Sequence, residues 1–255
     1  HTCFESTFYG EWKEVEKMAI PKKIHYVWVG GKEKPKDIQR CMKTWKKFLK
    51  DYEIIEWNEN NFDINSHPFV KAAYEAKKWA FVSDYIRAYA LYTQGGVYFD
   101  TDIIMIDSID DLLENRAFVG YEAPEFPFTA VFGAEKGHPF VKDILDSYEN
   151  VEKEFDFKNN NTISVSKILI DKYECKLGNK EQILPEGIKV YRDGVLCNIS
   201  KETKTIHVFT TTWLDRKSKF AQKVYKFIKL RLTSKFRVNL YVGYLNLKAK
   251  LKGKK

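Results

Sequence analysis

The segment from residue 79 to residue 102 constrains the fold most, because a helix pattern, a stop and a buried strand follow one another without a gap. WAFVSDYIRAYALYTQ has apolar residues at helical spacing, and Gly95-Gly96 ends the pattern. The apolar run VYF then has the β-branched and aromatic character of a buried strand. Two carboxylates, Asp100 and Asp102, stand where we expect that strand to end.

Strand and helix patterns also alternate on either side of this segment. IHYVWV (24–29) and YEIIEW (52–57) are typical of strands, and residues 35–49 between them have a helical period. This succession predicts a right-handed βαβ unit of a parallel sheet. We expect further strands near 103–106, 117–121, 128–134, 182–185, 188–192 and 205–209, and helices that begin at His67-Pro68 and His138-Pro139. The prediction is an α/β domain with a mixed central sheet flanked by helices.

Composition limits the class of protein. The 255 residues are 44% hydrophobic and 15% aromatic, which is enough for a large core. Four scattered cysteines without a C-x-x-C pair favour a reducing cytoplasm, and no run approaches the roughly 18 apolar residues of a spanning helix. The chain begins with His rather than Met, so we expect residues 1–17 to be vector-derived or to lie outside the core, and residues 18–215 to form the main domain.

The C-terminal residues 216–255 differ from the rest in charge. They hold 14 of the 43 Lys and Arg residues and none of the 35 Asp and Glu residues. Apolar residues and one arginine recur there at helical spacing: Phe220, Val224, Phe227, Ile228 and Arg231. We expect a basic amphipathic helical appendage that contacts an anionic membrane surface. Packing on the domain without a membrane is the alternative, and nucleic acid is not expected because no recognised binding motif accompanies the charge.

The two carboxylates at the strand end suggest a metal. Open α/β sheets bind ligands at the carboxyl ends of their strands, and alternation in an extended segment would point Asp100 and Asp102 to one face. Carboxylates that close repel each other unless a cation joins them. Mg²⁺ and Mn²⁺ suit carboxylate oxygens and keep positions for phosphate oxygens. The D-x-D spacing also occurs at turns and helix caps, so it does not establish a function alone.

A second pair of charges precedes the strand. Asp84 and Arg87 are three residues apart on the expected helix, so they share a face and can form an ion pair. Apolar residues surround them, which favours a buried pair over a surface one, and buried charges usually serve a site.

SDYIRAYALYTQGGVYFDTD resembles the signature of the glycosyltransferases whose sugar-binding region contains the D-x-D motif, glycosyltransferase family 32. That group includes yeast-type initiating α-mannosyltransferases and bacterial capsular sugar transferases, and the segment is also similar to the catalytic domain of the clostridial glucosylating toxins. IHYVWVGG and EWNENNF resemble the first two strands of these enzymes. The resemblance is specific from about residue 20 to residue 110, looser to residue 213, and does not cover the tail.

The resemblance implies a GT-A-like, Rossmann-type sheet and retaining transfer of a hexose from a nucleotide-diphosphate sugar, with a UDP-sugar favoured and Mn²⁺ or Mg²⁺ bound. It implies that Asp102 binds the metal directly, and that Asp100 contacts the donor and reaches the metal through water. Asp84 and Arg87 would hold hydroxyls of the transferred sugar, with Arg87 also near the diphosphate. No nucleophile is assigned.

Other donor contacts are implied in the same way. Tyr98 would lie beside the nucleotide, Trp28 would stack on the base, and Asn60 is a weaker candidate for a donor contact. HVFTTTW resembles a late H-x-x-x-S-W-like element of the bacterial relatives, although Thr stands here in place of Ser. His207 would then be a metal ligand, and Trp213 would close over the diphosphate. An ordinary core role for Trp28 and a satisfied polar role for His207 are the alternatives.

These features together predict a cytoplasmic, peripheral membrane sugar transferase with a glycan acceptor, lipid-linked, in bacterial surface polysaccharide synthesis. A haloacid-dehalogenase-type phosphatase is one rival, but its D-x-D motif normally follows the first strand of the domain. A non-enzymatic membrane-surface or nucleic-acid-binding module is the other. It would leave the four charged residues of the helix and strand end (Asp84, Arg87, Asp100 and Asp102) unexplained.

Overall fold

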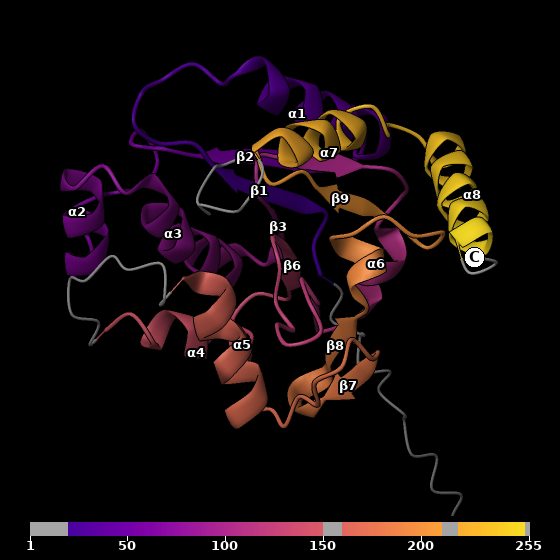
Figure 1. Ribbon diagram of the computed structural model, residues 1–255. Helices are drawn as coiled ribbons and strands as arrows, with labels where there is room; N and C mark the ends of the chain where they lie inside the picture. The colour runs from indigo at the N-terminus through magenta and orange to yellow at the C-terminus, as the bar shows by residue number, and fades with distance from the viewer. Residues whose placement is uncertain (1–19, 150–159, 211–218, 253–255) are drawn as a thin grey trace, which may run out of the picture.

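The computed structural model describes residues 20–149, 160–210 and 219–252. Within these residues seven strands form a central sheet in the order β2-β1-β3-β6-β5-β8-β7, with helices packed around it (Figure 1). The strands are β1 Lys23–Val27, β2 Glu53–Trp57, β3 Gly96–Phe99, β5 Ala117–Gly120, β6 Val131–Ala134, β7 Gln182–Leu184 and β8 Ile188–Tyr191. β4 (Ile103–Met105) leaves the sheet and pairs with β9 (Thr205–His207) as an antiparallel ribbon. The predicted mixed α/β sheet is confirmed.

The first unit of the sheet is the predicted βαβ unit. β1 and β2 are parallel and α1 (Lys36–Phe48) connects them, while β3 joins the other side of β1, also parallel. Two helices, α2 (Pro68–Glu75) and α3 (Trp79–Gln94), lead from β2 to β3. The His67 and His138 side chains accept hydrogen bonds from the backbone N–H two residues later, so both cap helices, as expected from the His-Pro pairs.

The direction of the strands decides which of their carboxyl ends lie at the same edge of the sheet. β6 is antiparallel to both β3 and β5, and β8 is parallel to β5. Five strands, β1, β2, β3, β5 and β8, therefore run in one direction and end at the same edge of the sheet. Ligands of open α/β sheets bind at such an edge.

Both faces of the sheet are covered. In β3 the Tyr98 side chain packs with one hydrophobic cluster and the Val97 and Phe99 side chains pack with another. The first cluster includes side chains from α2, α3, α4 (Pro139–Asp146) and α5 (Asn161–Asp171). The second includes side chains from α1, β4, η1 (Asp110–Glu114) and α6 (Asp193–Leu196). Because it is buried on both sides, β3 is apolar throughout, which is why the sequence shows a continuous apolar run there.

The Gly95-Gly96 stop is required by the backbone. Both glycines have positive φ, 66° and 113°, and a Cβ atom on Gly96 would lie 2.7 Å from the Lys23 carbonyl oxygen. Only glycine allows so close an approach at this φ. The turn thus brings β3 directly beside β1.

The C-terminal residues form two helices, α7 (Lys219–Lys229) and α8 (Lys235–Lys252), in keeping with the predicted helical appendage. α7 lies beside α1, where Lys226 pairs with Asp37 at 2.7 Å, and α8 stands at the margin of the molecule (Figure 1). The link between them packs on the domain, because Leu230 and Leu232 are buried with side chains of the β4–β9 ribbon. Among the described helices, none combines the length and the apolar character needed to cross a bilayer.

Candidate active site

The D-x-D residues lie in a turn rather than in an extended strand, so the expectation of an extended segment is wrong. β3 ends at Phe99, and the Ile103 N–H donates to the Asp100 carbonyl at 3.1 Å. The chain reverses here because β4 leaves the sheet to pair with β9. Asp100, Asp102 and His207 each offer one atom that could bind a metal, and these three atoms lie within 4.8 Å of one another. The turn therefore brings the two carboxylates together with an imidazole from β9, which is distant in the sequence.

Asp102 is buried and held by three contacts. Its Oδ2 accepts hydrogen bonds from the Thr210 N–H at 2.8 Å and from Thr210 Oγ1 at 3.1 Å, and its Oδ1 is 3.3 Å from His207 Nε2. Burial alone raises the pKa of Asp102, but the charge of His207 and these hydrogen bonds outweigh it and lower the pKa to about 2. Asp102 is therefore ionised at any physiological pH.

His207 reaches the turn because β9 pairs with β4, which places it opposite Ile103. Burial lowers the pKa of His207, but the charge of Asp102 outweighs burial and holds the pKa well above its ordinary value. The second ring nitrogen, Nδ1, is 4.0 Å from Glu122 Oε2. Metal-bound histidines usually turn their other N–H toward a carboxylate, and Glu122 is close to that position.

These three side chains fit a divalent cation. Two carboxylates and one imidazole suit Mn²⁺ or Mg²⁺, which take mainly oxygen ligands and leave positions for water and phosphate. A cation would also replace the proton that His207 otherwise holds against Asp102. Asp102 and His207 would bind it, and Asp100, which is partly exposed, would reach it directly or through water.

Arg87 connects the helix to the same strand end. Its Nη2 is 2.9 Å from Asp84 and 3.2 Å from Asp100, and its guanidinium lies over the Tyr98 ring at 4.6 Å from the centroid. The Tyr98 hydroxyl donates to Asp100 at 3.0 Å. The predicted buried Asp84–Arg87 pair is confirmed, and it extends to the D-x-D turn.

Asp84 has a carboxyl group that titrates close to neutrality. Burial raises its pKa to about 6, against the attraction of Arg87 and with some support from the negative charge of Asp100. Because the proton is bound only weakly near pH 7, a hydrogen bond from a ligand hydroxyl can shift the protonation equilibrium of Asp84 toward the carboxylate. Asp84 is thus the titratable end of the buried network.

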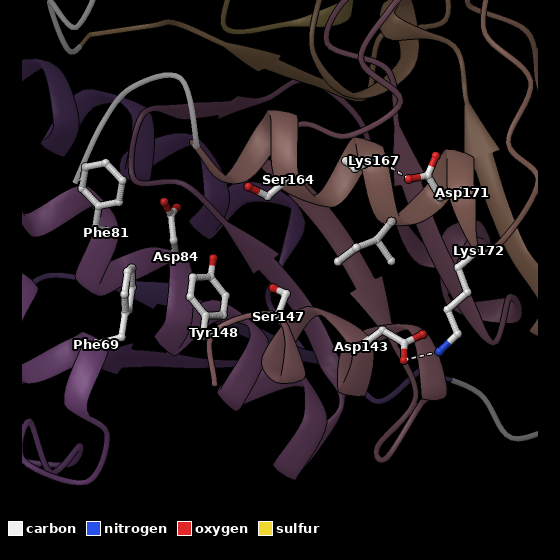
Figure 2. A pocket seen from close by; sticks show the side chains of 11 residues that line it. Phe69, Phe81, Asp84, Asp143, Ser147, Tyr148, Ser164, Lys167, Asp171 and Lys172 are labelled. Carbon is white, nitrogen blue, oxygen red and sulfur yellow. Dashed lines mark hydrogen bonds and ion pairs between the residues drawn. The ribbon is translucent and has the colours of Figure 1, made fainter. Parts of the chain in front are cut away.

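Asp84 also lines an open cavity of about 580 Å³ between α2, α3, α4 and α5. Figure 2 shows Asp84 and Tyr148 pointing into it, with Phe69 and Phe81 at the same end. The opposite end carries two ion pairs: Lys167 with Asp171, and Lys172 with Asp143. Aromatic faces and paired polar groups of this kind suit a sugar ring better than a fully apolar ligand.

Two predicted donor residues lie in neighbouring loops at the carboxyl ends of β1 and β2. The half-buried Trp28 donates from Nε1 to the Lys32 carbonyl at 2.6 Å, and the exposed Asn60 follows β2. The Gly30 N–H donates to Glu59 Oε1 at 2.6 Å, which joins the two loops. Donor contacts of Trp28 and Asn60 stay predictions, and Trp213 lies outside the described residues.

Three residues of this neighbourhood were not predicted: Thr210, Glu122 and Lys229. Lys229 on α7 is fully buried, and its ammonium donates to the His207 carbonyl at 2.6 Å beside the Phe209 ring. Glu122 follows the end of β5, and burial raises its pKa. Because Glu122 follows the end of a predicted strand, its position in the sequence could have suggested it as a site residue. No local pattern indicates Thr210 or Lys229, because each depends on contacts between distant segments.

Comparison with known proteins agrees with the resemblance seen in the sequence. Residues 35–119 match the family model described as the glycosyltransferase sugar-binding region containing the DXD motif. Inositol phosphoceramide mannosyltransferase 3 of Schizosaccharomyces pombe is 29% identical over 134 residues, 51% of this chain and 37% of that protein. Mannosyl phosphorylinositol ceramide synthase CSH1 of Saccharomyces cerevisiae is 27% identical over 163 residues, 59% of this chain and 40% of that protein.

The matched segments thus span about two fifths of these curated relatives. Among solved structures, one named PaToxG glycosyltransferase matches with a TM-score of 0.48 and 19% identity, over 60% of this chain and 69% of that chain. This likeness is too distant to support an inference about activity. The sequence match over residues 35–119 is the finding that bears on function, because it contains Asp84, Arg87 and the D-x-D turn.

Proposed function

Because residues 35–119 carry the sugar-binding region of the DXD glycosyltransferases, we propose that this protein transfers a hexose from a nucleotide-diphosphate sugar to a glycan acceptor, with a divalent metal. One observation carries the proposal: Asp100, Asp102 and His207 converge within 4.8 Å at the carboxyl edge of the sheet, and Arg87 contacts Asp100. A UDP-sugar is the favoured donor, Mn²⁺ or Mg²⁺ the metal, and the transfer retains the anomeric configuration.

The roles of the side chains follow from charge. The diphosphate gains negative charge as the glycosidic bond breaks, and a metal held by Asp102, Asp100 and His207 supplies positive charge there. Arg87 adds a second, permanent positive charge beside Asp100. Asp84 and Arg87 orient hydroxyls of the transferred sugar from the side of the cavity that Asp84 lines.

The remaining donor contacts complete the proposed site. Tyr98 lies beside the nucleotide, and its hydroxyl also orients Asp100. Trp28 stacks on the base from the loop after β1, and Asn60, in the loop after β2, is a weaker candidate for a donor contact. Trp213 closes over the diphosphate. No protein nucleophile is required if the acceptor attacks from the side on which the diphosphate leaves. The proposed catalytic domain is 18–215.

The acceptor is proposed to be lipid-linked and the protein to act at the inner face of a membrane, with residues 216–255 on its anionic surface. Two matched relatives are named for mannosyl transfer to inositol phosphoceramide, a lipid, which supports a lipid-linked acceptor. The excess of Lys and Arg in residues 216–255 supports the membrane contact. A cytoplasmic setting is proposed from the scattered cysteines, and a role in bacterial surface polysaccharide synthesis from the resemblance of the sequence.

Thermal unfolding with candidate donors tests the proposal. UDP-, GDP- and CMP-linked sugars are added to the 255-residue chain with and without Mn²⁺. A donor at 100 times its Kd adds about 2.7 kcal/mol to the free energy of unfolding, so we expect one donor to raise Tm only when Mn²⁺ is present. If none of these donors shifts Tm with Mn²⁺, the proposal fails.

A further inference from the structure

Helix α8 has two apolar faces, and only one of them packs on the domain. Val238 is fully buried, and Tyr241 and Val242 pack against the same cluster. The opposite face is exposed: Phe236 77%, Leu240 66%, Tyr244 55%, Leu247 58% and Leu251 62%. At 3.6 residues per turn these five side chains fall within about 80° of the helix circumference and extend over roughly 22 Å. We call them the α8 stripe.

A hollow of about 400 Å³ lies beside the α8 stripe and carries two arginines. Arg231 and Arg237 line it together with Leu232, Leu240, Tyr241 and Tyr244. The Arg237 Nη1 donates to the Arg231 carbonyl at 3.1 Å, so the two residues are held together. Within the described residues no carboxylate lies within ion-pair distance of either guanidinium. The Arg231 guanidinium lies over the Phe227 ring, 4.3 Å from its centroid. Two arginines that line one hollow favour an anion with several oxygens, such as a phosphate group.

From these features we propose that the α8 stripe and the Arg231–Arg237 hollow form the membrane-binding element, with the hollow taking the phosphate of an anionic phospholipid and the stripe entering the bilayer interface. This inference deepens the proposed membrane contact of residues 216–255 and names the side chains that make it. It does not depend on the metal site.

The charge of the surrounding surface decides between possible occupants. Leu240, Tyr244, Leu247 and Leu251 have the spacing of a coiled-coil seam, so a second copy of the chain is one alternative. The pattern covers only two heptads, and each copy would bring 14 basic and no acidic residues of its tail to the interface. Like charges would then oppose pairing, whereas an anionic leaflet attracts them.

Nucleic acid is also anionic, but it does not suit the α8 stripe. Proteins that bind phosphate backbones present basic and aromatic side chains, and three of the five stripe residues are leucines. A large exposed apolar patch beside basic groups is typical of a helix that lies in a membrane interface. The phospholipid bilayer accounts for both halves of the element.

Co-sedimentation with lipid vesicles tests this inference on the whole chain. Phosphatidylcholine vesicles are used with and without phosphatidylglycerol, and we expect binding only when phosphatidylglycerol is present. Arg231→Gln with Arg237→Gln should lower the partition coefficient by roughly tenfold or more, since each basic group near the surface contributes about fivefold. The matched control is Lys71→Gln with Lys136→Gln, two exposed lysines on the domain, and should bind as the parent chain does.

The α8 stripe is tested separately. Leu240→Glu with Leu247→Glu should lower the partition coefficient strongly at both low and high ionic strength, because salt screens charges and not apolar burial. Leu177→Glu with Ile183→Glu, which changes exposed apolar residues elsewhere, is the control and should bind normally. Normal binding by the stripe variant, or a dimer of the parent chain that the stripe variant loses, would overturn the assignment.

Donor hydrolysis with Mn²⁺, measured without vesicles, separates this inference from the proposed function. We expect the variants of α8 and of the hollow to hydrolyse donor as the parent chain does. A parent chain that hydrolyses donor but ignores phosphatidylglycerol vesicles would overturn the inference and leave the function standing. A chain that binds vesicles through the α8 stripe but never uses a donor would overturn the function and leave the inference standing.

Discussion

The acidic edge of the sheet and helix α8 distribute charge and apolar surface in opposite ways. At the sheet edge Asp84, Arg87 and Asp102 are buried, and each is paired with a group of opposite charge. At the start of α8, Lys235 pairs with Asp107 of the domain, but the exposed Arg237 has no carboxylate partner among the described residues. Large apolar side chains of α8, such as Leu240, are exposed as well. The first region satisfies its groups internally, and the second does not.

This difference bears on what each region can do. A buried charge must find its partners within the protein, so the sheet edge is organised before any ligand arrives. An exposed apolar stripe loses its contact with water only when something covers it, which makes α8 a surface for association. Lys229 of α7 links the basic tail to the sheet edge, because its buried ammonium donates to the His207 carbonyl.

The largest effect should come from removing Asp102. In Asp102→Ala, Mn²⁺-dependent donor hydrolysis should fall by roughly a thousandfold, because the strongest anionic ligand of the proposed metal is lost. Vesicle binding should not change. Asp51→Ala, which removes an exposed carboxylate paired with Lys22, is the control. Hydrolysis that survives in Asp102→Ala would show that the sheet edge does not hold the metal.

Arg87→Met should cause the next largest effect, on stability. It leaves buried Asp84 and the neighbouring Asp100 without their cation, so the free energy of unfolding should fall by about 3–5 kcal/mol in urea titrations. Adding Asp84→Asn should restore part of the loss, because the unpaired buried charge disappears. A loss below about 1 kcal/mol in Arg87→Met would mean that the network is not closed as described.

The pH dependence of the reaction tests Asp84. Its pKa is raised from 3.8 to about 6, so the carboxylate that we propose accepts sugar hydroxyls is lost as the pH falls below that value. The rate of transfer should fall about tenfold per pH unit on that side, and Asp84→Asn should be slower but lack this acid limb. A parent profile that is flat between pH 5 and pH 7, the range in which a carboxyl group with a pKa of about 6 titrates, would contradict this role.

The same pKa shift has a defined sign for stability. The folded chain binds the Asp84 proton more tightly than the unfolded chain does, so this group contributes stability at low pH. That contribution is lost as the pH rises from about 4 to about 6. In urea titrations across this range, the free energy of unfolding of the parent chain should decrease more steeply with rising pH than that of Asp84→Asn.

The smallest effect is expected at the contact between the tail and the domain. Lys226 on α7 pairs with Asp37 on α1 at 2.7 Å, and both side chains are partly exposed. Lys226→Gln should lower the free energy of unfolding by less than about 1 kcal/mol, as for other surface pairs. A loss of several kcal/mol would show that this pair, rather than the buried Leu230 and Leu232, anchors the tail.

The local elements of this protein were predictable from the sequence, because they depend on neighbours a few residues apart. The Gly95-Gly96 stop, the apolar strand after it and the Asp84–Arg87 pair each follow from spacing within one helix or strand. The resemblance of residues 83–102 to the D-x-D glycosyltransferases could be recognised for the same reason, and the match over residues 35–119 agrees with it. The βαβ opening also followed from the order of its patterns.

The tertiary structure decided which distant groups meet. Thr210 lies 108 residues from Asp102 and yet donates two hydrogen bonds to it, because β9 pairs with β4. The D-x-D segment turns rather than extends because β4 leaves the sheet at that point. Burial of Lys229 and the second apolar face of α8 likewise depend on which side of each helix meets the domain. Spacing along the chain determines a helix or strand, but the closure of long loops and the packing of faces determine its partners.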